Sequence, residues 1–306
     1  MSESIMRHNM TLLEMIGNTP LLDLSFLSQT PDSIKLFAKA EWLNPGGSLK
    51  DRPVKAMLLH AIESGELTPG KTILDSSSGN AGISYSMIGA ALGFPVTIVI
   101  PGNASNERKL RLKAHGATLI ETDPLEGYDQ ALRHVRDIYA ESRDKYFYCD
   151  QYSNQFNVQA HFHGTAKELL HQSPQAITHF VCGVGTGGSL TGIARRLKQT
   201  NADIRIVGVR PQVWPGIEGL KPLGHPDDII PAIFDASLVD EWIDISADEA
   251  KDMSQKMAGH GYFLGQSSGA YLAASEKLML SLTSGVVTTL LCDLGERYFS
   301  SGLWQR

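Results

Sequence analysis

The feature that most constrains the fold of this chain is a regular alternation between short apolar segments and longer segments with helical character. Segments typical of β-strands lie at 34–40, 72–75, 95–100, 117–121, 146–149, 177–184, 204–209, 242–245 and 286–291. Segments typical of helices lie between them, at about 50–62, 83–92, 105–115, 126–142, 155–171, 189–199, 247–258 and 269–282. Repeated strand–helix units predict an α/β protein with mostly parallel sheets, right-handed connections and binding sites at the carboxyl ends of the strands.

The length, net charge and cysteine content of the chain limit which classes of protein it can belong to. Its 306 residues suffice for two α/β domains or one large barrel. A net charge of −6, without blocks of like charge, argues against a nucleic-acid partner. No apolar run reaches membrane-spanning length, and residues 1–10 contain no signal-peptide core. Three scattered cysteines argue against a disulfide framework, so we expect a cytoplasmic protein.

The most informative short stretch runs from Asn44 to Arg52 and reads NPGGSLKDR. Its two glycines allow a loop to pack against a flat ligand, and Ser48 is a good N-cap for the helix that follows. Lys50 then falls in the first helical turn, where the positive end of the helix dipole disfavours an ammonium group. A lysine buried there would have a pKa lowered toward the neutral amine that attacks carbonyls, whereas a solvated lysine would have no such role.

A second stretch, 183–188 (GVGTGG), matches the dinucleotide-binding fingerprint between a strand and a helix. The acidic residue that would hold a ribose hydroxyl is missing, because the next strand ends in Val209, Arg210 and Pro211. Since an arginine could suit a 2′-phosphate, an NADP-dependent oxidoreductase stays open. Backbone N–H groups at a helix start, together with the hydroxyls of Thr186 and Ser189, in either case predict a phosphate cup that suits a single phosphate.

Three other patterns lack the context that their chemistry needs. Residues 65–72 fit a P-loop but follow a helix and open a strand, which is the reverse of what a P-loop requires. Residues 265–269 fit the nucleophile elbow of α/β-hydrolases, yet no histidine follows His260. The pair His161 and His163 has no third ligand in a matching arrangement, so we predict no metal site. The segment 214–231, rich in proline and glycine, is expected to be an irregular surface excursion.

Taken together, these parts resemble the pyridoxal-phosphate enzymes of the tryptophan-synthase β fold type, and most closely the cysteine synthases (O-acetylserine sulfhydrylases). The shared motifs run in order through 17–21, 44–52, 78–80, 107–108, 185–188 and 295–298, while 233–241 and 292–293 look more like the bacterial B isozyme than the A isozyme. The resemblance implies two three-layer α/β domains with mostly parallel twisted sheets. Residues 44–155 would form a smaller mobile domain, 1–43 with 156–306 a larger one, and the cofactor site would lie in the cleft between them.

The resemblance also assigns roles by position. Lys50 would hold pyridoxal 5′-phosphate and later move the α-proton, Asn80 would hydrogen-bond its ring oxygen, and Ser267 would face its pyridine nitrogen. The cup that would hold the phosphate consists of Gly185, Thr186, Gly187, Gly188 and Ser189. The substrate carboxylate would be held by Ser77, Ser78 and Gln151, next to Ala81. The family usually has a threonine where this chain has Ala81, so one hydroxyl that binds the carboxylate is missing.

The implied activity is cysteine synthesis from O-acetylserine and sulfide, or another sulfur donor, by elimination of acetate through an aminoacrylate and addition at Cβ. Because of Ala81, related chemistry stays open: another nucleophile, O-phosphoserine as substrate, or a serine/threonine dehydratase. The family is typically homodimeric, and we expect the same here, with small-molecule substrates and neither nucleic-acid nor membrane partners.

Overall fold

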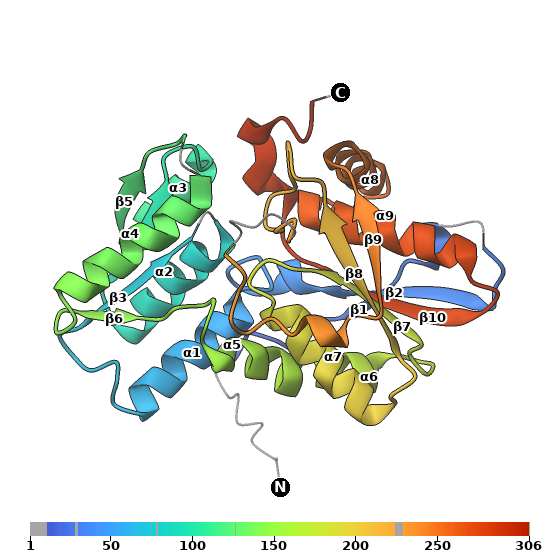
Figure 1. Ribbon diagram of the computed structural model, residues 1–306, viewed down its shortest axis with the longest axis horizontal. Coiled ribbons are helices and arrows are strands. Elements are labelled where there is room, and N and C mark those ends of the chain that lie inside the picture. The colour runs from blue at the N-terminus through green and yellow to red at the C-terminus, as the bar shows by residue number, and fades with distance from the viewer. Residues whose placement is uncertain (1–10, 28–29, 78, 126, 224–228, 306) are drawn as a thin grey trace, which may run out of the picture.

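A computed structural model of the protein describes residues 11–27, 30–77, 79–125, 127–223 and 229–305. These residues form two sheets, which lie in separate halves of the molecule (Figure 1). The smaller sheet has the order β5-β4-β3-β6, and each of its strand pairs is parallel. Its strands are β3 (Thr72–Ser76), β4 (Val96–Pro101), β5 (Thr118–Thr122) and β6 (Tyr146–Tyr148).

The larger sheet has the order β1-β2-β10-β7-β8-β9. Its strands are β1 (Leu21–Asp23), β2 (Ile34–Ala40), β7 (His179–Gly183), β8 (Arg205–Pro211), β9 (Glu241–Ile245) and β10 (Gly285–Leu291). Only β1 pairs antiparallel among these described strands, and the other pairs are parallel. The predicted α/β class with mostly parallel sheets is therefore confirmed.

Helices cover both sheets. The α-helices are α1 (Asp51–Glu63), α2 (Asn80–Leu92), α3 (Asn106–Ala114), α4 (Gly127–Glu141), α5 (Gln155–Ala160), α6 (Ala166–Gln172), α7 (Gly188–Thr200), α8 (Ala247–Gly259) and α9 (Gln266–Ser281). Short helices are η1 (Ser25–Leu27), η2 (Glu41–Leu43), the π-helical η3 (His161–Thr165), η4 (Ala236–Leu238) and η5 (Gly295–Ser301). In Figure 1, α8 and α9 lie on one side of the larger sheet and α5 to α7 on the other.

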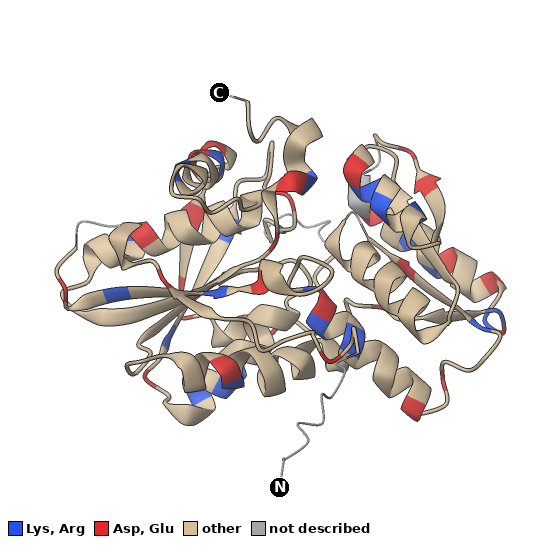
Figure 2. Cartoon of the chain, turned by 180° about the vertical axis from the view of Figure 1, so that it is seen from behind, with Lys and Arg blue, Asp and Glu red and all other residues tan. Residues whose placement is uncertain are grey.

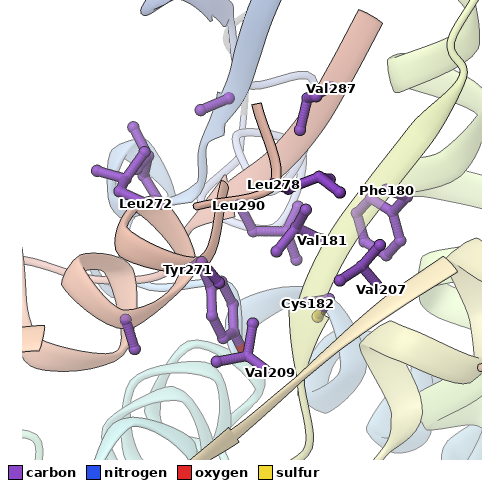
Figure 3. Close-up of a cluster of buried hydrophobic side chains, with 14 of the residues drawn as sticks. Phe180, Val181, Cys182, Val207, Val209, Tyr271, Leu272, Leu278, Val287 and Leu290 are labelled. Carbon is purple, nitrogen blue, oxygen red and sulfur yellow. The ribbon is translucent and has the colours of Figure 1, made fainter. Parts of the chain in front are cut away.

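The core of the larger half forms where α9 packs on the sheet. Side chains from β7, β8 and β10, including Phe180, Val207 and Leu290, meet Tyr271 and Leu278 of α9 (Figure 3). These strand residues are fully buried because helices cover both faces of the sheet, which explains why the strands read as continuous apolar runs instead of alternating ones.

Two local predictions were wrong. Helix α1 begins at Asp51, so Lys50 is its N-cap and Ser48 is not; the Ser48 side chain instead accepts a hydrogen bond from the Lys50 N–H at 3.3 Å. Contacts with a distant part of the chain explain the later helix start. Ser48 forms a β-bridge with Asp293, and the Leu49 N–H donates to the Cys292 carbonyl. The single helix expected at 155–171 is divided by η3, a π-helical turn of the kind that inserts one residue into a helix.

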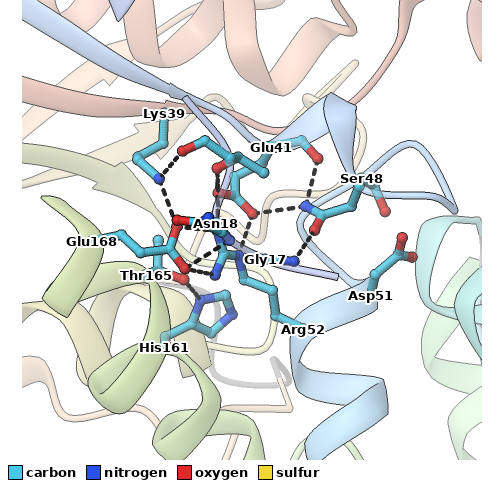
Figure 4. A network of polar contacts seen from close by, with 12 residues as sticks. Gly17, Asn18, Lys39, Glu41, Ser48, Asp51, Arg52, His161, Thr165 and Glu168 are labelled. Atoms are coloured by element: carbon cyan, nitrogen blue, oxygen red, sulfur yellow. Dashed lines mark hydrogen bonds and ion pairs between the residues drawn. The ribbon is translucent and has the colours of Figure 1, made fainter. Parts of the chain in front are cut away.

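A buried ion network fixes the first turns of α1 (Figure 4). Arg52 donates to Glu41 at 2.6 and 2.8 Å and to Glu168 of α6 at 2.6 and 2.7 Å. Lys39 of β2 also donates to Glu168, at 2.6 Å. Burial alone would raise the pKa of Glu168, but the hydrogen bonds and charges of Arg52 and Lys39 outweigh it and lower this pKa to about 2. The network therefore consists of charged side chains, and it links β2, η2, α1 and α6.

Charges elsewhere are dispersed, and Figure 2 shows acidic and basic residues interspersed over both halves of the molecule. Among the helices of the described ranges, none combines the length and the apolar character needed to span a bilayer.

Replacing Glu41 tests how much the ion network contributes to the free energy of unfolding. Glu41→Gln leaves the buried Arg52 charge half compensated, so we expect the free energy of unfolding to fall by about 3–5 kcal/mol. Urea unfolding measures this. Asp32→Asn, which removes an ion pair between Lys35 and a fully exposed carboxylate, is the control and should leave the midpoint unchanged. Equal midpoints for the two variants would contradict a stabilising network.

Candidate active site

A cavity of about 890 Å³ lies between the two halves, beside the carboxyl ends of strands from both sheets. Of the predicted site residues, it brings together Lys50, Ser77, Asn80, Ala81, Gln151, Gly185, Thr186, Ser189 and Ser267. Gly187 and Gly188 belong to the same glycine loop but do not line the cavity, and Ser78 lies outside the described residues. Residues more than 200 positions apart thus meet in one place, as parallel strand–helix units predict.

Lys50 lies in the cavity wall, at the start of α1. Burial lowers the pKa of its amine below the ordinary lysine value, while Cys292, Cys182 and Asp293 oppose the shift to a smaller extent. A lowered pKa raises the fraction of neutral amine, which is the form that attacks carbonyl groups and accepts protons. The pKa of Lys50 is thus lowered, as expected for a buried lysine, but Lys50 is the N-cap of α1 and does not lie in its first turn.

The glycine loop has no room for side chains, because neighbouring parts of the protein pack closely against it. A Cβ on Gly185 would lie 2.6 Å from the Gly219 carbonyl oxygen, and one on Gly188 would overlap the amide of Asn157. Gly187 has a φ of +82° just before α7 begins, a conformation that favours glycine. The Asn157 amide donates to the Thr186 hydroxyl at 3.0 Å, so that the hydroxyl hydrogen of Thr186 is free to point elsewhere. The backbone N–H groups of this loop, at the start of α7, fit a phosphate.

The loop after β3 brings polar groups to the opposite wall. The Ser77 hydroxyl accepts the N–H groups of Gly79 and Gly82 at 3.1 and 2.8 Å, which leaves its hydrogen available to a ligand. Gln151 donates to the Ser76 carbonyl at 2.8 Å and so stays beside this loop. Ala81 lines the cavity with a methyl group only.

Asn80 opens α2, and its amide is held from the far end of the chain. Its Nδ2 donates to Asp293 Oδ2 at 2.7 Å, and Arg297 donates to its Oδ1. Tyr298 in turn donates to Asp293 Oδ2 at 2.8 Å. This orientation leaves one N–H of Asn80 for a ligand. Asp293 and Arg297 carry a function in orienting Asn80 that sequence reasoning missed, although both lie in motifs that it had noted.

Ser267 lies in the first turn of α9, inside the pattern that fits a nucleophile elbow. It lines the cavity beside Cys292, and sequence order already argued against a hydrolase. His161 is buried in η3, where it pairs with the Thr165 hydroxyl at 2.9 Å, and burial lowers its pKa to about 3. Among the described residues, no three His, Cys, Asp or Glu side chains gather as metal ligands would.

Comparison with known protein families shows to which class of enzyme the chain belongs. The family model described as "Pyridoxal-phosphate dependent enzyme" matches residues 12–293, so the chain belongs to a family of enzymes that use this cofactor.

Relatives then give the particular family. The chain is 43% identical over 302 residues to a cysteine synthase of Aquifex aeolicus, covering 96% of this chain and 92% of that one. It is 38% identical to a cysteine synthase B of Pseudomonas aeruginosa, covering 96% and 97%. A crystal structure of cysteine synthase from Entamoeba histolytica superposes with a TM-score of 0.91 at 32% identity, covering 100% and 94%. The chain therefore belongs to the cysteine synthase family of pyridoxal-phosphate enzymes, as predicted.

Pyridoxal phosphate is the cofactor of this family, and the residues present fit it. The lowered pKa of the Lys50 amine suits a bond to its aldehyde, and the backbone N–H groups of the glycine loop at the start of α7 suit its one phosphate. This membership favours the single-phosphate interpretation of 183–188 over the NADP-dependent oxidoreductase.

One buried acid lies beside this site without lining the cavity, and it was not among the predicted site residues. Asp75, in β3, accepts hydrogen bonds from the Tyr85 hydroxyl at 2.6 Å and from the Ser76 N–H at 2.7 Å, and the Gln151 N–H lies at 3.3 Å. Burial, with a smaller contribution from Asp150, raises the pKa of Asp75 to about 7 against those hydrogen bonds. The sequence indicates such a site only by a charged residue, Asp75, at the end of the otherwise largely apolar segment 72–75, which predicts a strand and no more.

Asp75→Asn should change how stability depends on pH. Because the folded-state pKa is raised, protonated Asp75 stabilises the fold below about pH 4, and this contribution is lost as the pH rises through about 7. The asparagine variant has no such loss. Its free energy of unfolding should rise relative to wild type by on the order of 4 kcal/mol over this range. Urea unfolding at several pH values measures the difference, and parallel curves would contradict the shifted pKa.

Proposed function

We propose that this protein makes cysteine from O-acetylserine and sulfide, or another sulfur donor, by pyridoxal-phosphate-dependent β-replacement. The observation that carries the proposal is one cavity that contains both a lysine with a lowered pKa and a glycine phosphate cradle, in a chain of the cysteine synthase family. When bound, the cofactor links to the substrate amine through its aldehyde and accepts the electrons released at Cα.

Lys50 moves the proton in this scheme. Its neutral Nζ accepts the proton from the substrate Cα, after which acetate leaves from Cβ and the sulfur nucleophile adds there. The same amine then returns a proton to Cα. Burial favours the neutral form before the transfer, since a charged ammonium could not act as the base.

The remaining wall residues bind and orient. The free hydrogen of Ser77, together with Gln151, would hold the substrate carboxylate, and the free N–H of Asn80 would bind the cofactor ring oxygen. Ser267, which lines the cavity, would face the pyridine nitrogen. A neutral hydroxyl does not keep that nitrogen protonated as a carboxylate would, so the ring withdraws electrons less strongly and elimination is favoured over transamination.

Because Ala81 lacks the hydroxyl that the family usually has at this position, the test compares substrates directly. Purified protein is mixed with sulfide and with O-acetylserine, O-phosphoserine or serine, and cysteine is measured. The proposal expects the highest kcat/KM with O-acetylserine. A clear preference for O-phosphoserine, or pyruvate as the product from serine, would replace it with the corresponding related reaction.

Lys50→Ala should abolish the reaction. Loss of the base that moves the α-proton should lower kcat by at least about 10³-fold in the cysteine-forming assay. Lys55→Ala is the matched control on the same helix, because Lys55 donates to the Leu13 carbonyl and does not line the cavity. Full turnover by Lys50→Ala would refute the assignment.

We also propose the domain arrangement and the assembly. Residues 44–155 would act as a smaller domain that closes over the substrate, against 1–43 with 156–306. Two ion pairs, Arg108 with Glu218 and Lys221 with Asp129, cross the cavity between these units and support the proposal. A cytoplasmic location fits three cysteines that are free and buried.

The assembly proposed is a homodimer, as the family resemblance implies. Light scattering coupled to size exclusion should give about twice the chain mass of 33.3 kDa. A mass equal to that of one chain at micromolar concentration would contradict it.

A further inference from the structure

Asn157 is a buried side-chain amide on α5 that lies beside the glycine loop but does not line the cavity. The residue is 2% exposed, and its Nδ2 donates two hydrogen bonds. One goes to the Gln151 carbonyl at 2.8 Å, and the other goes to the Thr186 hydroxyl at 3.0 Å. Because Thr186 does line the cavity, Asn157 can act on a ligand through this hydroxyl.

Close packing of α5 against the start of α7 fixes the position of the amide. A Cβ on Gly188 would overlap the Asn157 amide, and a Cβ on Gly192 would overlap the Val158 carbonyl oxygen. The two glycines of α7 therefore allow α5 to approach closely. A side chain packed in this way has little freedom to turn.

The hydrogen-bond partners determine which way the amide and the hydroxyl point. A carbonyl oxygen can only accept, so Nδ2 of Asn157 must face Gln151, and its second hydrogen is then directed to Thr186. The Gly188 N–H also approaches the Thr186 hydroxyl oxygen, at 3.4 Å, and it can only donate. The Thr186 hydroxyl thus accepts from both neighbours, and its own hydrogen must point away from both of them.

We propose that Asn157 is a positioning residue for the cofactor phosphate: by donating to Thr186, it keeps the hydroxyl hydrogen of Thr186 directed at a phosphate oxygen. The inference rests on the proposed phosphate-binding role of the glycine loop and extends it to a residue outside the cavity. Without Asn157, the hydroxyl could rotate and donate to a neighbouring protein oxygen instead. The phosphate would then lose a charge-assisted hydrogen bond.

The test measures cofactor binding, which does not depend on turnover. Holoenzyme is dialysed to equilibrium against graded concentrations of pyridoxal 5′-phosphate, and the bound cofactor is read from the visible absorption spectrum. Asn157→Ala should raise the dissociation constant about tenfold, because the Thr186 hydrogen is no longer directed. Thr186→Val, which removes the hydroxyl, should raise it by at least as much. Thr186→Ser keeps the hydroxyl and should bind as the wild type does.

Double variants separate positioning from a general loss of structure. If Asn157 acts through the Thr186 hydroxyl, Asn157→Ala should add no more than about twofold to the dissociation constant of Thr186→Val. In Thr186→Ser, where the hydroxyl is present, it should keep its effect of about tenfold. Effects of Asn157→Ala that are equally large in both backgrounds would overturn the proposal.

Asn154→Ala is the matched control on the same helix. Asn154 accepts from the Phe156 N–H at 3.0 Å and donates to the Cys149 carbonyl at 3.0 Å, so this change also removes two hydrogen bonds, but none to the glycine loop. It should leave the dissociation constant unchanged. An equal increase in both alanine variants, or no increase in a folded Asn157→Ala, would overturn the proposal. If Asn157→Ala does not fold, Asn157→Asp decides: a carboxylate cannot donate, so weaker binding supports the proposal and unchanged binding overturns it.

Failure of the proposed phosphate site would look different. Thr186→Val would then bind the cofactor as the wild type does, and both the role of the loop and this inference would fall. Absence of cysteine formation would affect only the proposed reaction, because cofactor binding is measured without substrates.

Discussion

The site depends on a guanidinium held between two carboxylates. Arg52 contacts Glu41 on one side and Glu168 on the other, and all three groups are shielded from solvent. Because each charge is costly to bury without its partners, any displacement of the first turn of α1 that separates these groups costs free energy. Lys50 lies two residues before Arg52, so the network that fixes the arginine also fixes where the amine enters the cavity.

The second constraint comes from the chain's far end. The Asn80 amide is oriented by Asp293 and Arg297, which lie 213 and 217 positions away in the sequence. Arg297 also donates to the Gly46 carbonyl, in the loop that precedes Lys50. One C-terminal segment thus holds both the loop with the lysine and the loop with the asparagine. This coupling explains how two sheets with separate cores can present one set of polar groups to a ligand.

Local patterns in the sequence were sufficient to predict most of the alternation of strands and helices and to single out Lys50 and the glycine loop, because each depends on neighbouring residues. The roles of Lys50 and of this loop toward the cofactor stay predictions. Features set by distant partners could not be found in this way. Ser48 has the residue type of an N-cap, but its bridge to Asp293 moves the helix start to Asp51. The pairing of Arg108 with Glu218 joins α3 to an irregular segment that no periodicity describes. Asp75 was hidden within an apolar strand, and only its burial against Tyr85 reveals a shifted pKa.

The central claim is that the cofactor is held by the amine of Lys50. Treating the purified holoenzyme with borohydride would make that link permanent, and digestion followed by mass spectrometry would locate it. The account predicts that the mass of the reduced cofactor is found on the peptide that contains Lys50, together with loss of the visible colour. Cofactor attached to another lysine, or colour that resists reduction, would contradict it.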